Sequence, residues 1–149
     1  MRKQRQGGFL IAKIHQISGR IFARILKESD VRLNPAQGRI MFVLWREGPM
    51  PITGLCRRTS LGKSTLTGML DRLERDGYVR RVPSREDRRV INIEATAMDE
   101  ENRRAFARVS EIMTSIWYKG FGEKDIDQFE ARLFTVLSNL TSYEKENPS

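Results

Sequence analysis

The sequence contains one cysteine and one histidine among its 149 residues. A single cysteine cannot form a disulfide within the chain, which favours a reducing, cytoplasmic location. No apolar run approaches the length of a transmembrane helix. The short apolar patch near the N-terminus is interrupted by Lys13 and His15 and lacks a small-residue cleavage site. We therefore expect no membrane segment and no signal peptide.

The residue groupings that support catalysis are also missing from the sequence. It shows no Ser/His/acid set, no glycine-rich nucleotide loop and no cluster of metal ligands. One histidine and one distant cysteine do not make a metal site. The sequence therefore predicts a protein that is not an enzyme and that needs no metal or cofactor.

The chain is basic, and its charge is unevenly distributed. Its formal net charge is +8 and its pI is about 10.1. Residues 1–29 carry seven Lys or Arg against one acidic residue, and residues 57–90 carry ten against five. Residues 94–149 reverse the balance, with seven basic residues against eleven acidic ones. This distribution favours a polyanionic partner that faces the basic first two-thirds of the chain.

Hydrophobic periodicity predicts a mainly α chain with one β-hairpin, an α+β fold. Asn34 and Pro35 indicate a helix start, and Gly77 indicates a helix end. The expected strands cover 78–82 and 89–93, joined by a charged tip over 83–88. The expected helices cover 9–29, 35–47, 52–58, 63–76, 96–119 and 124–143, and a loose tail follows over 144–149.

The order helix, strand, arginine-rich tip, strand is that of a winged helix-turn-helix. We predict such a DNA-binding domain over 31–95, between an N-terminal tail and helix (1–30) and C-terminal helices (96–149). The outer helices are long and amphipathic, with more apolar surface than a monomer of this size needs. They predict a homodimer, in which Phe129 and Leu133 would contribute to the interface. Its two-fold axis would match a pseudo-palindromic operator.

The helix expected over 63–76 begins with small polar side chains. A helix that enters a DNA major groove must keep bulky side chains off its leading face, and hydroxyl groups can reach bases or phosphates. Gly62 would leave backbone N–H groups free to face a phosphate. A capped surface helix would show the same start, but the basic hairpin that follows favours DNA contact. The predicted contacts in this region are Arg57, Arg58, Gly62, Lys63, Ser64, Thr65, Thr67, Gly68 and Arg72.

The hairpin tip carries Arg85, Arg88 and Arg89, with Asp87 among them. Arginine is favoured in a narrow minor groove by the negative potential there. Asp87 would repel phosphate, so we predict that it holds a neighbouring arginine, Arg89, in a fixed pose. A solvated charged turn is the competing interpretation. The flanking strands favour DNA contact.

Together these segments resemble the MarR family. The resemblance rests on Leu33–Gln37, Gly62–Thr67, Leu70–Glu74, Gly77–Arg81, Asp87–Arg89 and Ala95–Thr96, in that order. It implies a dimeric winged-helix transcription regulator that binds double-stranded DNA; members of this family are often repressors that small aromatic acids or oxidants release. The sequence does not distinguish activator from repressor.

Two further interpretations follow from single residues. Cys56 is expected to be a buried small apolar residue, because a redox sensor needs an exposed thiolate. An effector pocket for a small aromatic ligand would involve His15, Met41 and Trp45. A solvated or interface position is the simpler role for His15, and core packing is the simpler role for Met41 and Trp45. Two other functions stay open: an effector-independent architectural DNA binder, and a winged-helix module that binds protein.

Overall fold

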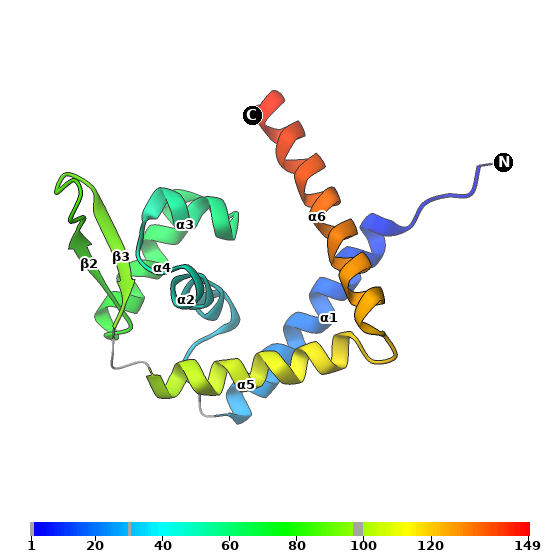
Figure 1. The fold of residues 1–149 in the computed structure, drawn as a ribbon, viewed down its shortest axis with the longest axis horizontal. Helices are drawn as coiled ribbons and strands as arrows, with labels where there is room; N and C mark the ends of the chain where they lie inside the picture. Colours follow the sequence, from blue (N-terminus) through cyan, green and yellow to red (C-terminus); the bar gives the residue numbers. More distant parts are fainter. Residues whose placement is uncertain (1, 30, 97–99) are drawn as a thin grey trace. The chain divides into compact units, whose positions relative to one another are not determined.

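The computed structural model describes residues 2–29, 31–96 and 100–149. The chain forms two compact units, Met1–Glu111 and Ile112–Ser149. The three-part division predicted from the sequence stays a prediction. Along the chain the elements are α1 (Gly7–Glu28), α2 (Pro35–Glu47), β1 (Met50–Pro51), α3 (Ile52–Thr59), α4 (Lys63–Arg75), β2 (Val79–Pro83), β3 (Ile91–Ala95), α5 (Glu100–Trp117) and α6 (Glu123–Glu146) (Figure 1).

Helix α2 begins at a complete capping box. The Asn34 side chain accepts a hydrogen bond from the Gln37 N–H at 2.8 Å, and the Gln37 side chain accepts one from the Asn34 N–H at 3.1 Å. Pro35 occupies the first helical position. An N–H at this position has no acceptor within the helix, so proline, which lacks one, costs no hydrogen bond here. The helix buries Ile40, Met41 and Leu44 in the core of the first unit. The predicted start of this helix is confirmed.

Helix α4 is anchored by three leucines, Leu66, Leu70 and Leu73, which are fully buried. Gly62 is its N-cap. At the other end Gly77 has φ +84°, a left-handed conformation that suits glycine. Its N–H and that of Tyr78 donate to carbonyls of the last helical turn. The chain therefore turns sharply from α4 into β2, which fixes where the hairpin starts.

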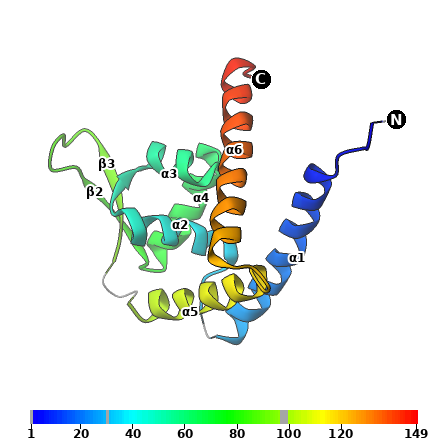
Figure 2. The ribbon, with the colours of Figure 1, turned by 45° about the vertical axis from the view of Figure 1, so that its right-hand side comes forward.

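The sheet is antiparallel, with strand order β1-β3-β2. Strands β2 and β3 pair from Val79↔Ala95 to Pro83↔Ile91, so β3 begins two residues later than predicted. Strand β1 was not predicted, because two residues that include a proline carry no periodic signal. The loop that joins β2 and β3 is an outer extremity of the first unit (Figure 2).

The N-terminal part of α5 packs against α2 at a glycine. A Cβ placed on Gly38 would overlap Cε2 and Cζ of the Phe106 ring, so only glycine lets the two elements approach this closely. The Phe106 ring also packs edge-to-face with the rings of Phe22 and Trp45, at centroid distances of 5.5 and 5.7 Å. This aromatic cluster ties α1, α2 and α5 together within the first unit.

The second unit consists of the end of α5, a turn and α6. Gly120 has φ +88° in the turn, and the Tyr118, Phe121 and Phe129 rings pack on one another at 5.5 to 6.1 Å. Tyr118 donates a hydrogen bond to Glu130 at 2.8 Å. Burial, followed by this bond to Glu130, raises the pKa of Tyr118. The unit is held by this small cluster, since no residue of α6 is buried.

The two C-terminal helices differ from their predicted bounds. The predicted helix over 96–119 corresponds to α5, whose described part is Glu100–Trp117, and residues 97–99 lie outside the described residues. Helix α6 extends to Glu146, so the first half of the predicted loose tail is helical. The high helix propensity of glutamate and lysine explains this extension.

Candidate DNA-binding surface

We call α4 the recognition helix and residues 79–95 the wing. The recognition helix presents an open face of small polar side chains, on the side opposite its buried leucines. Lys63, Ser64 and Thr65 are exposed in its first turn. The Thr67 hydroxyl donates to the Lys63 carbonyl at 2.8 Å, which leaves its oxygen as an acceptor. The face therefore offers donors and acceptors without bulky groups, as a major-groove helix requires.

Gly68 lies in the middle of this face. An added Cβ would meet no heavy atom within 4 Å, so packing within the protein does not require glycine here. Glycine inside a helix costs about 1 kcal/mol of stability relative to alanine. Its presence on an exposed face is explained if another molecule approaches the helix backbone at this point.

The wing tip holds one arginine in a fixed pose. Asp87 Oδ1 accepts from the Arg89 backbone N–H at 3.0 Å and from Nε at 3.1 Å, and Oδ2 accepts from Nη2 at 3.1 Å. These bonds, the side-chain ones first, lower the pKa of Asp87. The Arg89 side chain is nevertheless 91% exposed. The predicted clamp between Asp87 and Arg89 is confirmed, while its contact with DNA stays a prediction.

The other predicted cations differ in whether an acidic side chain already pairs with them. Arg57, Arg72, Arg85 and Arg88 are exposed. Arg58 instead donates from Nε to Glu47 at 2.9 Å, an ion pair that ties α3 to the end of α2. Part of its charge is already compensated, so we expect Arg58 to contribute less to phosphate attraction than the exposed arginines.

Arg81 was not predicted as a functional residue, yet it joins the wing to the recognition helix. It forms ion pairs with Asp71 and Glu74, two carboxylates that lie one turn apart on α4. The spacing of these acids, followed by the arginine pair at the start of the hairpin, was the available sequence signal. It was uninformative without the geometry that brings β2 back against α4.

The three residues proposed for an effector pocket do not line one hollow. His15 is exposed on α1, whereas Met41 is fully buried in the core. Trp45 is half-buried and borders a hollow of about 410 Å³ whose lining includes Arg80 and Arg103 but neither His15 nor Met41. Trp45 is therefore the one member of the predicted set that lines this hollow.

Cys56 is half-buried on α3 and packs against the core without being part of it. The prediction of a buried apolar residue is therefore only partly met. In the ranges that the structure describes, no three His, Cys, Asp or Glu residues lie together as a metal site would require. In the same ranges, no helix has both the length and the apolar content to cross a membrane.

A small sheet, a helix with an open polar face and an arginine-tipped hairpin define a winged helix-turn-helix protein. The family model described as the MarR family matches residues 33–91. The HTH-type transcriptional repressor IacR of Pseudomonas putida is 26% identical over 132 residues, which cover 89% of this chain and 78% of the relative. Residues 33–91 thus match the MarR family, and the relatives that align over most of the chain are HTH-type transcriptional repressors, so the comparisons support a MarR-type transcription regulator and not an enzyme.

Solved structures share the fold. A mutant MarR from E. coli, crystallised with operator DNA, has a TM-score of 0.74 at 24% identity and covers 87% of this chain and 92% of its own. BpsR of Bordetella bronchiseptica, whose DNA binding is regulated by 6-hydroxynicotinic acid, has a TM-score of 0.73 at 18% identity. The match covers 95% of this chain and 96% of BpsR. Both confirm the predicted architecture.

Proposed function

We propose that the protein is a homodimeric repressor that binds a pseudo-palindromic operator. Each recognition helix would enter a major groove, and each wing tip would place Arg89 in the adjoining minor groove. The observation that carries the proposal is the Asp87–Arg89 clamp, which fixes an almost fully exposed arginine at the tip of the hairpin that follows the recognition helix. A clamped arginine loses less conformational freedom on binding than a free one.

Phosphate attraction would come from the exposed cations around this surface. Lys63 and Arg72 lie on the recognition helix, Arg57 on α3, and Arg85 and Arg88 at the wing tip. Each contact would release counterions from the duplex, so the affinity should fall steeply with salt. An operator on DNA also requires access to the genome, and we propose a cytoplasmic location for this reason.

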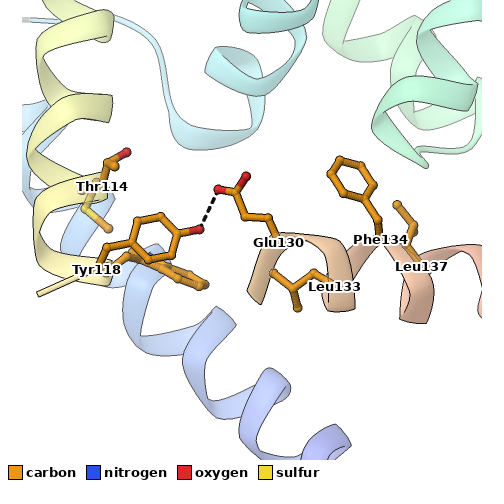
Figure 3. A pocket seen from close by; sticks show the side chains of 8 residues that line it. Thr114, Tyr118, Glu130, Leu133, Phe134 and Leu137 are labelled. Atoms are coloured by element: carbon orange, nitrogen blue, oxygen red, sulfur yellow. Dashed lines mark hydrogen bonds between the residues drawn. The ribbon is translucent and has the colours of Figure 1, made fainter. Parts of the chain in front are cut away.

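The proposed homodimer rests on apolar faces that each unit leaves open. On α6, Phe134, Leu137, Leu140 and Tyr143 are between 53% and 69% exposed. A groove of about 650 Å³ lies between the end of α5 and α6, lined by Trp117, Phe134 and Leu137 around the Tyr118–Glu130 pair (Figure 3). Phe129 and Leu133 are half-buried within the unit itself, so the outer residues replace them as the interface we propose.

The partner that we propose for this face is a second copy of the chain. On α1, Phe9, Leu10, Ile11, Ile14 and Ile17 are between 40% and 68% exposed. The first 27 residues carry no acidic residue, whereas α6 carries Glu123, Asp125, Asp127, Glu130, Glu144 and Glu146. The charges of the two ends are complementary, so they would attract one another in a symmetric pair.

We also propose that a small aromatic acid releases the protein from DNA. The hollow beside Trp45 combines an indole face with the guanidinium groups of Arg80 and Arg103, although Glu94 and Glu100 share the lining. A flat ring with a carboxylate fits that combination of stacking and charge. BpsR, which shares the fold, is regulated by a molecule of this class.

Selection of bound duplexes from a random pool tests the function. We expect a two-fold symmetric sequence motif, and tighter binding to it than to scrambled DNA at physiological salt. Enrichment without a motif would favour an architectural DNA binder, and no retention of DNA would favour a protein-binding module. If a panel of aromatic acids leaves the operator affinity unchanged, the effector part of the proposal is wrong.

Gly68→Ala should move folding and DNA binding in opposite directions. Because the site is open, alanine should raise the free energy of unfolding by up to about 1 kcal/mol through helix propensity. The same methyl group would occupy the space that we assign to DNA, so operator affinity should fall. Thermal melts and operator titrations on one preparation measure both. Unchanged affinity would show that DNA does not approach the helix at Gly68.

A further inference from the structure

Arg81 bridges two elements that would contact different grooves. From β2, its Nη1 donates to Glu74 Oε1 at 2.7 Å and its Nη2 donates to Asp71 Oδ1 at 2.9 Å. The Arg81 backbone N–H also donates to Glu74 Oε2 at 3.2 Å. One carboxylate of the recognition helix thus binds both the side chain and the main chain of the wing's first strand.

Arg81 is not placed to bind DNA itself. Its side chain is 31% exposed, against 91% for Arg89, and both of its terminal nitrogens donate to carboxylates. Burial by itself lowers the pKa of Arg81, but the hydrogen bonds and charges of Asp71 and Glu74 together outweigh it and raise that pKa. The cluster of one cation and two anions has a net negative charge. Such a cluster near DNA opposes phosphate attraction, so a purely electrostatic role in binding does not explain it.

We infer that Arg81, held by Asp71 and Glu74, is a positioning residue that fixes the wing against the recognition helix. The inference rests on the proposed DNA-binding function. A specific site requires that the α4 side chains and Arg89 reach their grooves at the same time. An orientation fixed before binding avoids the entropy of ordering the wing on the DNA. Non-specific binding, which depends on charge, does not need this alignment.

The wing supplies a matched control for this ion-pair cluster. The neighbouring arginine, Arg80, pairs with Glu94, but both residues lie within the hairpin. Glu94→Gln therefore removes one carboxylate of the wing without separating the wing from the recognition helix. If variants of the Arg81 cluster lose operator binding and Glu94→Gln does not, the loss cannot be due to the removal of negative charge alone.

The decisive variant is Asp71→Asn with Glu74→Gln. It removes two negative charges from the recognition helix, so electrostatics alone predicts tighter binding to every duplex. A positioning role predicts the opposite for the operator: roughly tenfold weaker binding, with affinity for scrambled DNA unchanged or higher. Glu94→Gln should lower the operator affinity little or not at all. Titrations against both duplexes at one salt concentration give the ratio.

Arg81→Lys provides a second test at constant charge. A lysine carries the same charge, but its single ammonium group cannot span both carboxylates as a guanidinium fork does. We expect the operator affinity to fall while the affinity for scrambled DNA and the salt dependence stay the same. Circular dichroism at the assay temperature identifies any variant that unfolds. The lysine variant then decides the question if the double variant does not fold.

The outcomes separate this inference from the proposed function. If the wild-type protein shows no preference for any selected duplex, the proposed function is wrong. If the wild type is specific and both variants keep its ratio of operator to scrambled affinity, Arg81 has no positioning role. Equal losses on both duplexes would also overturn the inference, because they would indicate a general effect of charge or folding.

Discussion

Replacing Arg89 with alanine is expected to abolish specific operator binding without unfolding the protein. The side chain is 91% exposed, and its hydrogen bonds go to Asp87, only two residues away, so the fold gains little from it. Surface substitutions of this kind change the free energy of unfolding by about 0.5 kcal/mol or less. In the complex, by contrast, this arginine would occupy the minor groove, where the negative potential is concentrated.

Arg88→Ala is the matched control for this variant. Arg88 is a second exposed arginine at the same tip, but in our interpretation it serves phosphate attraction alone. Its loss should weaken operator and scrambled duplexes alike, and it should reduce the salt slope by about one unit. Arg89→Ala should instead remove the difference between the two duplexes. Gel-shift titration at several salt concentrations measures both. Wild-type binding by Arg89→Ala would show that the wing assignment is wrong.

Asp87→Asn separates the clamp from the charge of the tip. The change makes the tip more positive, which by itself favours DNA. The side chain loses the second carboxylate oxygen that accepts from Nη2 of Arg89, so the arginine is held less firmly. We expect weaker operator binding despite the more favourable charge. Tighter binding would show that Asp87 acts only as a repulsive charge and does not orient Arg89.

The clamp also has a defined pH dependence. Arg89 lowers the pKa of Asp87 in the folded protein, so the carboxylate stays ionised as the pH falls to its ordinary range. The contribution of the pair is present above the unfolded pKa and is lost only as the pH falls through the lowered folded value. Operator binding near neutral pH should therefore be insensitive to Asp87 titration.

Local signals explain which parts of the fold could be predicted. The start of α2 depends on Asn34 and Pro35, and the end of α4 depends on Gly77. These residues act on backbone groups only a few positions away, so the local sequence is enough to predict both helix ends. The Asp87–Arg89 clamp is also local. Strand β1 could not be predicted, because its two residues become a strand only by pairing with β3, some forty positions away.

Non-local contacts explain the parts of the site that could not be predicted. On α6 the apolar stripe is wide, and periodicity alone does not tell which edge is covered within the unit. The Tyr118 ring packs on Phe129, which leaves Phe134 as the exposed edge. Likewise, Arg80 and Arg81 are adjacent in the sequence, which does not show which of them faces α4. The turn at Gly77 sets the direction of β2, so that Arg81 pairs with Glu74 of α4 while Arg80 pairs with Glu94 of the wing.

The exposed edge of α6 leads to the second large expected effect. Leu137→Glu with Leu140→Glu should convert the proposed homodimer into monomers. These side chains are 53% and 64% exposed and share one helix face, so charged replacements should not disturb the unit's own packing. Full burial of a leucine contributes roughly 1.5 to 3 kcal/mol. Losing two should therefore raise the dimer dissociation constant by at least about a hundredfold.

Asn139→Glu is the control for charge, because it adds an acidic side chain to an exposed polar position of the same helix. Sedimentation equilibrium should show a dimer for the wild type and this control, and a monomer for the double variant. A wild type that is monomeric at micromolar concentration would contradict the assembly, and a dimeric double variant would contradict the proposed interface.

The two sets of variants together distinguish assembly from recognition. A two-fold operator gives a dimer two linked half-sites, so a monomer loses the gain of simultaneous engagement even with its DNA surface unchanged. The double leucine variant should thus bind the operator weakly while keeping a preference for an isolated half-site over scrambled DNA. Arg89→Ala should show the reverse: a stable dimer without that preference. If both variants lost both properties, the dimer interface and the DNA surface would not be separate parts of the molecule.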